Sequence, residues 1–490
     1  MSRAASAAVA WQPPAVHAGW TARWFAGDAA LAAAFGPPPS ASSLAAQARA
    51  LDAFAARGTR ADWRGLLSPS GTTPPSDALV VVAGQQPMLG GGPALVAHKA
   101  ATAIRLAALL GESLRRAVIP VFLFADEDHD SDEVDHLDLA VAGADRLERL
   151  RCPIHPGHDC FFRSRWDGTA LHAVLERIGA SGGGASGAGG GAGAGEDEGQ
   201  DFSAHVEALL SASFGHLGLR TVRAHALTAR ASPLLLDALQ EPSAFRAELA
   251  AGAERLSAAH LPASFDAADP RPLVLESRDG RRRRLAAGDA DAPARLRRSP
   301  QDFSPDAALR PVVQAAALPV VAQVAGPSEL LYLGQARGLH ARAGVPPAVL
   351  VPRLEATAVP AALLEQLDVE LDALRFDDRP DDPAERRLLE AAEAFARRIE
   401  EADAALSSRA RRWLADTARG ARRLVESIAW RGGTPPGTVQ RLRPRGSPQD
   451  TVLAWTPDAW AGDPARWGSR VVELCRPLDP PAHAVYVIPD

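Results

Sequence analysis

The stretch DALVVVAGQQPMLGGGPALVAHKAATAIRLAALLG (77–111), followed by AVIPVFLFADEDHD (117–130), decides the fold. Residues 77–84 and 117–125 are short apolar runs, which are typical of buried strands. Between the runs, a Gly-rich turn leads into residues 93–111, which predict a helix opened by Pro and closed by Gly. A strand, a helix and a second strand in this order form the opening unit of a parallel α/β sheet.

The same criteria predict further elements along the chain. Core strands are expected at 218–225, 318–326 and 348–353, a helix at 202–214, and a hairpin over 271–288 that turns at Asp279-Gly280. The low-complexity tract at about 179–200 predicts a disordered linker within an insertion. The sequence therefore predicts a parallel α/β sheet interrupted by inserted segments.

The pattern changes at about residue 382, where apolar residues begin to recur at helical spacing between charges and continue to residue 431. This pattern predicts either a two-helix hairpin or coiled coil that forms a dimer arm, or a helix packed on its own domain. The expected organisation is a core over 1–375, a helical arm over 376–431 and a C-terminal segment over 432–490 that packs on the core.

Composition excludes several classes of protein. The chain has 490 residues, 47% of them hydrophobic and 23% charged, as in soluble globular proteins. Its net charge of -6 argues against a general nucleic-acid binder. The sequence contains no apolar run of about 18 residues, which a membrane-spanning helix would need. The first residues have no sustained apolar run, and Cys152, Cys160 and Cys475 suggest neither a disulfide framework nor a zinc site. We expect a cytoplasmic, reduced protein that binds neither nucleic acid nor membrane.

Lys99 is the single lysine in the chain, since the total of 53 Lys and Arg leaves 53 - 1 = 52 Arg. An exposed charge can be Lys or Arg, but an ammonium that reaches one point in a tight pocket cannot be replaced by a guanidinium. We therefore expect Lys99→Arg to abolish turnover while leaving the melting temperature nearly unchanged.

The carboxyl ends of the strands are the expected place for a ligand. Gly84-Gln85-Gln86 closes the first strand, and the glycines at 90–92 would let backbone N–H groups approach an anion at the start of the helix. Lys99 lies about two turns into that helix and could reach back toward the anion. Neighbouring His98 points about 100° away around the helix.

The loop DEDHDSDEVDH (126–136) carries seven acids and two histidines directly after the second strand. It predicts a magnesium or substrate-amine site, a general acid/base pair, or a transition-metal site through His129 and His136. The alternative is a solvated run of charges, which a position directly after a buried strand makes less favourable.

A third group of candidates lies between residues 303 and 353. Arg310 and Arg353 stand in apolar surroundings, where each needs an anionic partner, either a substrate carboxylate or an internal acid. Tyr332 is one of two tyrosines, so its hydroxyl group is a further candidate. By contrast, Arg281–Arg284 are expected to form a solvated hairpin face.

Together these segments resemble the bacillithiol biosynthesis cysteine-adding enzymes, the BshC family. The similar motifs, in chain order, are GQQ (84–86), a Gly-Pro helix start running to Lys-Ala (92–100), EDHD (127–130) with DE (132–133), LRPVVQ (309–314), GP-x-E (326–329) and VPR (351–353). The resemblance covers about 75–355. The sequence departs from the family pattern within residues 87–92, at the helix positions Ala94, Val96 and His98 and at Ser131, and its end pattern at 446–450 matches the family only loosely.

The resemblance implies a Rossmann-like core with inserted connecting segments and an α-helical coiled-coil arm used for dimerisation. It also implies a ligase that joins the carboxyl group of cysteine to the amine of glucosaminyl malate or a related thiol precursor. Such a reaction needs an activated carboxylate, commonly an acyl phosphate or adenylate. The cofactor is left open, although a nucleotide such as ATP would fit, and no metal ligand is assigned. The alternatives are a metal-dependent hydrolase or transferase that uses loop 126–136, and a non-catalytic coiled-coil scaffold.

Roles follow for the candidate residues as hypotheses. The turn from Gly84 to Gly92, together with Lys99, would hold phosphate or carboxylate, and Asp128 or His129 would orient or deprotonate the attacking amine. Arg310 and Arg353 would hold substrate carboxylate, while Gln85, Gln86 and Tyr332 would supply hydrogen bonds. The remaining binding candidates are His98, Asp126, Glu127, Asp130, Gln314, Gly326 and Glu329.

Overall fold

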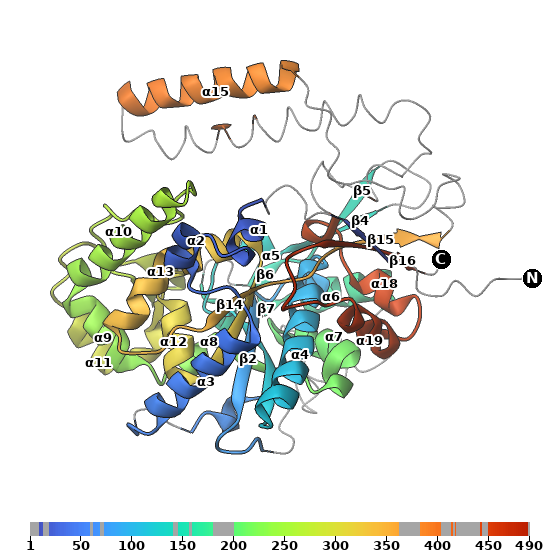
Figure 1. Ribbon diagram of the computed structural model, residues 1–490, viewed down its shortest axis with the longest axis horizontal. Helices are drawn as coiled ribbons and strands as arrows, with labels where there is room; N and C mark the ends of the chain where they lie inside the picture. The colour runs from blue at the N-terminus through green and yellow to red at the C-terminus, as the bar shows by residue number, and fades with distance from the viewer. Residues whose placement is uncertain are drawn as a thin grey trace, which may run out of the picture.

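A five-stranded parallel sheet forms the centre of the computed structural model (Figure 1). Its strands, in spatial order, are β14 (Val349–Pro352), β13 (Val320–Ala325), β2 (Leu79–Gln85), β3 (Val118–Phe124) and β9 (Arg220–Arg223). Each overlaps one of the predicted strand ranges, so the parallel α/β sheet is confirmed. The structure describes residues 9–12, 19–58, 62–68, 73–140, 146–155, 159–179, 200–361, 383–402, 413–414, 417, 442 and 449–488.

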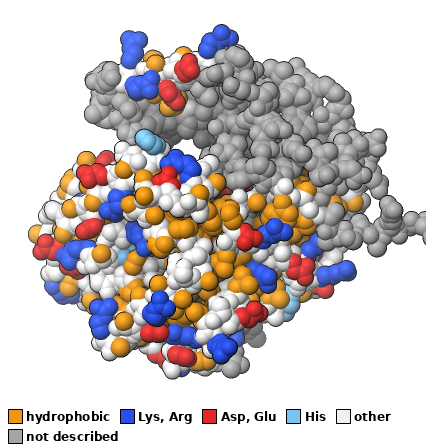
Figure 2. Space-filling model, viewed as in Figure 1, with side chains coloured by type: hydrophobic (Ala, Val, Ile, Leu, Met, Phe, Trp, Pro, Cys, Tyr) orange, Lys and Arg blue, Asp and Glu red, His pale blue; other side chains and the backbone are white. Residues whose placement is uncertain are grey.

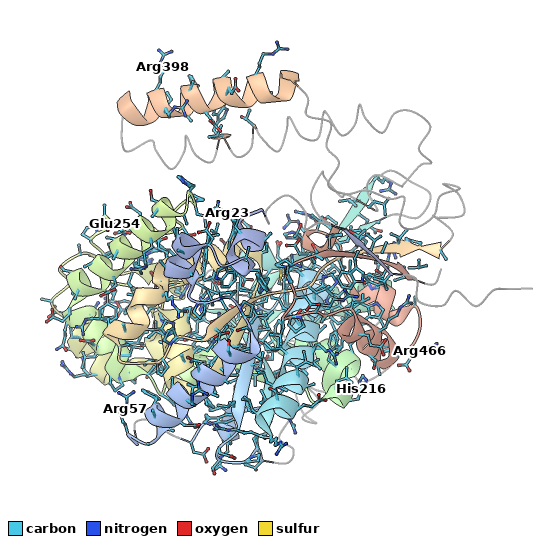
Figure 3. The ribbon with its side chains drawn as sticks, viewed as in Figure 1. Arg23, Arg57, His216, Glu254, Arg398 and Arg466 are labelled. Atoms are coloured by element: carbon cyan, nitrogen blue, oxygen red, sulfur yellow. The ribbon has the colours of Figure 1, made fainter. Side chains whose placement is uncertain are left out.

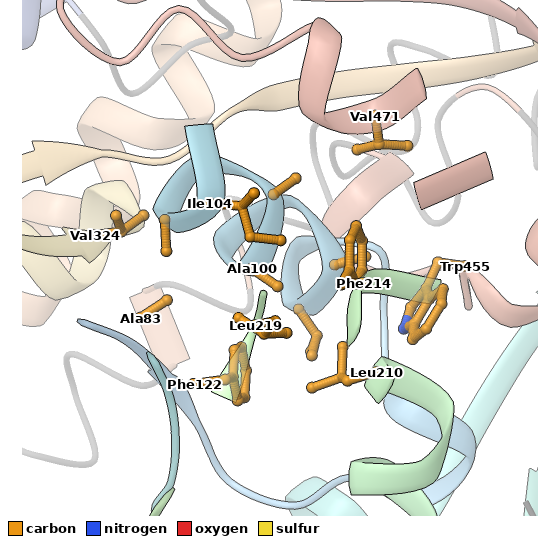
Figure 4. Packing of buried hydrophobic residues seen from close by; sticks show 14 of the residues in the cluster. Ala83, Ala100, Ile104, Phe122, Leu210, Phe214, Leu219, Val324, Trp455 and Val471 are labelled. Carbon is orange, nitrogen blue, oxygen red and sulfur yellow. The ribbon is translucent and has the colours of Figure 1, made fainter. Parts of the chain in front are cut away.

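Both faces of the sheet are buried, which explains why its strands are almost continuously apolar. Alternate residues of β2 face opposite sides: Leu79 and Val81 pack in one cluster, and Val80 packs in another. Helix α4 (Leu95–Leu114) covers the first face, where Figure 4 shows Ala100 and Ile104 near strand residues and near the C-terminal segment. The helix continues three residues past the predicted stop at Gly111.

The order in which the chain adds parallel strands to the sheet reverses at β2. The connection from β2 leads to β3 on one side, whereas β13 pairs with the other side of β2. Ligands in open α/β sheets bind in the crevice outside the carboxyl ends of the strands at such a switch point. Helix α13 (Pro327–Arg342) starts directly after β13 and borders this crevice.

Two insertions interrupt the sheet. The first, between β3 and β9, contains α5 (Ser131–Val134), β4 (His136–Ala140), β5 (Leu147–Arg151), β6 (Ile154–His155), β7 (Arg165–Trp166), α6 (Gly168–Arg177), β8 (Gln200–Asp201) and α7 (Ala204–Phe214). The linker predicted at 179–200 falls mostly outside the described residues, as the ranges above indicate.

The second insertion lies between β9 and β13. It contains α8 (Ala224–Thr228), α9 (Ser232–Gln240), α10 (Pro242–Ala258), β10 (Val274–Arg278), β11 (Arg281–Arg284), α11 (Ala292–Arg298), β12 (Phe303–Pro305) and α12 (Arg310–Ala317). The predicted hairpin is confirmed in β10 and β11. Its turn residues Asp279 and Gly280 both have positive φ, as a two-residue hairpin turn requires.

The two ends of the chain meet beside the core. Strand β16 (His483–Ile488) pairs with β1 (Val9–Gln12) and with β15 (Glu355–Pro360). The other terminal elements are α1 (Gly19–Phe25), α2 (Ala29–Phe35), α3 (Ala41–Ala55), α18 (Thr456–Trp460) and α19 (Pro464–Glu473). Helix α19 contacts α4 and α7, so part of the segment predicted to pack on the core does so.

Helix α15 (Pro383–Ala402) is the described part of the predicted arm and lies apart from the sheet in Figure 1. Its Ala392 and Ala396 are buried, whereas Leu388 and Phe395 are about half exposed. Most of residues 403–431 lie outside the described residues. The coiled coil therefore stays a prediction.

Charged side chains of both signs are scattered over the face of the body seen in Figure 2. Surface residues such as Arg57, His216 and Glu254 extend outward from their helices and turns (Figure 3). The three cysteines are buried and free. Among the described helices, none has the length and apolar character needed to cross a membrane.

Candidate active site

A cavity of about 690 Å³ opens at the carboxyl ends of β2 and β13. Of the seventeen residues predicted for the site, eleven line it: Gly84, Gln85, Gln86, Lys99, Asp128, Arg310, Gln314, Gly326, Glu329, Tyr332 and Arg353. Segments that are distant in sequence thus meet at the switch point of the sheet. The other six, Gly92, His98, Asp126, Glu127, His129 and Asp130, lie outside the lining.

Lys99 lies in the cavity wall but is almost completely buried. Its Nζ donates to the Gly84 carbonyl at 2.9 Å and to Gln85 Oε1 at 2.7 Å, and it pairs with Glu329 Oε2 at 2.6 Å. An ammonium has three donors, and all three have partners within the protein. Lys99 therefore holds β2 and α13 together and has no donor left for a substrate anion.

Glu329 is fixed by the start of α13 as well as by Lys99. It is the third residue of the helix, and its Oε2 accepts the backbone N–H of Gly326 at 2.7 Å. Burial lowers the pKa of Lys99, and the charge of Glu329 opposes this shift. The pair forms where two helices begin beside adjacent strands, so the wall depends on the parallel packing of β2 and β13.

The glycine turn is not the anion site that the sequence predicts. The Gly90 N–H donates to His205 Nε2 at 3.2 Å, and the Gly91 and Gly92 N–H groups bond carbonyls of their own turn. All three glycines have positive φ, and a Cβ on Gly91 would come within 3.0 Å of Trp455. The glycines allow close packing against the C-terminal segment, and their N–H groups bond within the protein.

Arg353 and His98 meet on a buried acid that sequence analysis missed. Arg353 Nη1 donates to Asp450 Oδ2 at 2.5 Å, and His98 Nδ1 lies 3.2 Å from the same oxygen. Burial acts against the charge on Asp450, but Arg353 and His98 outweigh it and lower the pKa of Asp450. Of the two partners considered for Arg353, the internal acid is the one present. His98 faces this acid and not the cavity.

Asp128 lies between two arginines. Its Oδ2 is 3.5 Å from Arg310 Nη2, and its Oδ1 is 3.6 Å from Arg282 Nη1. Burial acts to raise its pKa, but hydrogen bonds from His129 and the charges of both arginines outweigh this effect and lower it. Asp128 therefore stays ionised at neutral pH, and it suits orienting a substrate better than removing a proton.

Arg282 corrects the prediction that Arg281–Arg284 form a solvated face. It is buried and donates to Ser304 Oγ and to the Pro305 carbonyl, both at 2.9 Å, while the other three arginines are exposed. Because successive residues of a strand face opposite sides, Arg282 and Arg284 share one face of β11, and Arg282 is the residue of that face that is buried. That alternation was the signal available in the sequence.

The remaining residues of the acidic loop position it. Asp126 is buried and accepts the N–H and ring Nδ1 of His225 at 3.1 and 2.6 Å, which ties β3 to α8. Glu127 is also buried, and burial raises its pKa to about 7. His129 lies beside Arg282, with Nδ1 3.4 Å from the guanidinium, and Asp130 is exposed.

Arg310 keeps hydrogen-bonding capacity that no described residue uses. Its Nε is buried and has no hydrogen-bond partner in the described part of the chain. Buried unpaired donors are rare in native proteins and call for an explanation such as a bound ligand or water. Burial raises the pKa of nearby Tyr332, so its hydroxyl group stays a neutral donor. Because Tyr332 also hydrogen-bonds Glu329, Arg310 is the residue on this side of the cavity best suited to an anion.

Several cavity residues were not among the sequence candidates. They include Glu133, Gln323, Glu355, Asp450 and Thr451. Glu133 belonged to the recognised acidic loop, so its position in the sequence was a usable signal. Asp450 and Thr451 come from the C-terminal segment, where the loose match of residues 446–450 to the family's end pattern was the available signal.

No metal centre emerges from the described residues, which contain no group of three or more His, Cys, Asp and Glu arranged to hold an ion. The cationic Arg282 beside His129 would repel a metal there. His136 contacts its neighbour Asp135 at 3.1 Å. The two histidines of the loop therefore do not support a metal-dependent reaction.

Comparison with known proteins adds the family. The model for "Bacillithiol biosynthesis BshC, N-terminal Rossmann-like domain" matches residues 74–354, which include β2, β3, β9, β13 and β14. The chain belongs to the BshC family. The Rossmann-like core expected from the resemblance is thereby confirmed, and all eleven predicted residues of the cavity wall fall within the matched region.

Curated relatives in the BshC family carry the name "Putative cysteine ligase BshC". The protein of Shouchella clausii is 28% identical over 310 residues, covering 59% of this chain and 57% of its own. That of Symbiobacterium thermophilum is 29% identical over 369 residues, covering 65% and 64% respectively. That of Heliobacterium modesticaldum is 28% identical over 329 residues, covering 62% and 59%. The alignments thus span about six tenths of the length of these relatives.

Proposed function

We propose that this chain is a ligase that joins the carboxyl group of cysteine to the amine of glucosaminyl malate in bacillithiol biosynthesis. The observation that carries the proposal is the family match over residues 74–354, which includes the cavity wall from Gly84 to Arg353. The relatives named as cysteine ligases support the same reaction class. A related thiol precursor is the closest alternative acceptor.

The contacts in the cavity divide its residues between two tasks. Lys99 and Arg353 pair with Glu329 and Asp450, so they keep the wall in place. Arg310 lines the cavity with a side chain that is 18% exposed and whose Nη2 lies 3.5 Å from Asp128, and it is the cation that fits a substrate carboxylate or the oxyanion formed during acyl transfer.

A nucleotide that activates the cysteine carboxylate does not fit the glycine turn, because the N–H groups of that turn already have partners. We place the activated cysteine with its acyl carbon within the cavity, away from the glycine turn. Asp128, held as an anion, would orient polar groups of the acceptor.

The test is to incubate the purified protein with cysteine, glucosaminyl malate and ATP and to look for the amide product by mass spectrometry. We expect product only when all three are present, with other nucleoside triphosphates tried in parallel. If the folded protein makes no product with any nucleotide, the substrate assignment is wrong. Product formed with an analogue of the acceptor, and not with glucosaminyl malate, would shift the proposal to that thiol precursor.

We also propose that residues 376–431 form a coiled-coil arm that joins two copies of the chain, acting in the cytoplasm. Helix α15 supports the arm, because two of its alanines are buried while Leu388 and Phe395 are about half exposed. Sedimentation equilibrium should give the mass of a dimer. A Phe395→Glu variant that still sediments as a dimer would count against a role of Phe395 in joining the two copies.

A further inference from the structure

Three carboxylates in the cavity wall are held by cations. Glu329 lies 2.6 Å from Lys99 Nζ, and Asp450 lies 2.5 Å from Arg353 Nη1. Asp128 faces two guanidinium groups at 3.5 and 3.6 Å. A carboxylate beside a cation is stabilised in its ionised form, so it is a poor proton acceptor. These acids maintain the shape and charge of the wall.

Glu133 differs from these acids in its partner. Glu133 lies in α5, within the acidic loop, and its exposed side chain lines the same cavity. Its Oε2 accepts a hydrogen bond from the neutral amide of Gln86 at 3.0 Å, and it forms no ion pair with any described residue. Gln86 follows β2 and lines the cavity too. The amide holds the carboxylate at the cavity without neutralising it.

We propose that Glu133 binds the amine of the acceptor substrate and accepts the proton that this amine loses as the amide bond forms. The inference rests on the proposed function and assigns the proton acceptor within that site. Arg310 lines the same cavity, so the acceptor could place a carboxylate at Arg310 and its amine at Glu133.

An acceptor bound as an ammonium first releases one proton to water, and the neutral amine nitrogen then attacks the acyl carbon of cysteine activated as an acyl phosphate or acyl adenylate. The new C–N bond forms, and the bond from the acyl carbon to the leaving oxygen breaks, so the phosphate or nucleotide departs with the electron pair. The nitrogen gives one proton to the Glu133 carboxylate, which then releases it to water.

The electrostatic surroundings of Glu133 agree with this role. Partial burial raises its pKa, as do the charges of Asp130 and Asp128, while the hydrogen bond from Gln86 lowers it, and the net shift is upward. General bases work best when their pKa lies near the working pH. The same two neighbouring acids would attract a substrate ammonium toward Glu133.

The first test measures binding by calorimetry, using glucosaminyl malate and its N-acetylated form, which lacks a basic amine. Glu133→Gln should weaken binding of the free amine about tenfold and leave binding of the N-acetylated form unchanged, as expected for loss of one charge-assisted contact. Asp132→Asn is the matched control, because Asp132 is an exposed neighbour outside the cavity lining. Equal affinities of both ligands for wild type and Glu133→Gln would overturn the inference.

The second test follows turnover against pH. Glu133→Gln should lower kcat about 100-fold and remove the acid limb of the profile, whereas Glu133→Asp should retain that limb. A Glu133→Gln variant with wild-type kcat and profile would also overturn the inference. Wild-type protein that binds the amine through Glu133 but forms no amide would contradict the ligase function and leave the amine site standing. Wild-type protein that binds neither ligand would contradict both.

Discussion

Two cations of the cavity wall, Lys99 and Arg310, look alike in sequence, since each lies in the first turns of a helix, but they differ in how their donors are used. Lys99 is buried with three partners, the shortest contact being 2.6 Å to Glu329. Arg310 lies 3.5 Å from Asp128 and has a buried Nε without a partner in the described chain. A buried cation with all its donors paired stabilises the site, while a guanidinium that stays 18% exposed at the cavity can bind substrate.

The largest effect on stability should come from breaking the paired wall. Lys99→Met leaves Glu329 without its cation, and removing one partner of a buried pair costs about 3–5 kcal/mol of unfolding free energy. Chemical denaturation would measure this loss. In a double-mutant cycle, adding Glu329→Gln should restore part of it. A stability unchanged by Lys99→Met would mean that the pair contributes little and that Lys99 is kept for another purpose.

The stability that His205 gives to the glycine turn should depend on pH. His205 accepts the Gly90 N–H through Nε2, and burial lowers the pKa of His205 to about 4. Because the unfolded histidine has a pKa near 6.5, this contribution to stability is complete above pH 6.5 and is lost as the pH falls to 4. The loss should be about 3 kcal/mol for this group.

The free energy of unfolding should be measured against pH for wild type and for His205→Gln. The amide oxygen of the glutamine can still accept the Gly90 N–H. The variant should show a shallower loss of stability between pH 6.5 and 4. His172→Gln is the control, because that side chain is 60% exposed. Equal pH slopes in wild type and His205→Gln would show that His205 does not titrate as described.

Substitution of Arg310 should change catalytic activity more than stability. Arg310→Lys keeps the charge but loses the planar fork, so kcat/KM should fall about 30-fold, equivalent to about 2 kcal/mol, with a much smaller change in unfolding free energy. Arg281→Lys is the control on the exposed side of the hairpin. If Arg310→Lys unfolds more easily but turns over normally, Arg310 belongs to the structural group with Lys99.

The smallest effect is expected in the glycine turn. Gly91→Ala places a Cβ 3.0 Å from Trp455 at a positive φ, which should cost about 1–2 kcal/mol of stability. Substrate affinity should stay within twofold of wild type, about 0.4 kcal/mol, since the turn binds no ligand. A selective loss of affinity with normal stability would restore the anion cradle that the sequence predicted.

Sequence patterns predicted elements whose signals are local. The strands, the hairpin at Asp279-Gly280 and the helix that carries Lys99 all follow from periodicity and turn residues, so the place of the cavity could be predicted. The partners of the charges could not. His98 and Asp450 are 352 residues apart, and nothing near either residue shows that they meet.

Ambiguous local patterns account for the other differences. Glycines with positive φ serve a ligand cradle and a tight packing contact equally well, and only Trp455, 364 residues away from Gly91, decides between them. The expectation that Lys99→Arg would leave the melting temperature unchanged took Lys99 as a residue that holds a ligand in a pocket. Because Lys99 is buried with three partners, that substitution should lower stability as well.

The most direct test of the account is a crystal structure of the protein with glucosaminyl malate bound. We expect the ligand in the cavity at the carboxyl ends of β2 and β13, with a carboxylate at Arg310, the amine within hydrogen-bond distance of Glu133, and the Lys99 to Glu329 pair intact. A ligand bound outside this cavity, or one that displaces Glu329 to reach Lys99, would contradict it.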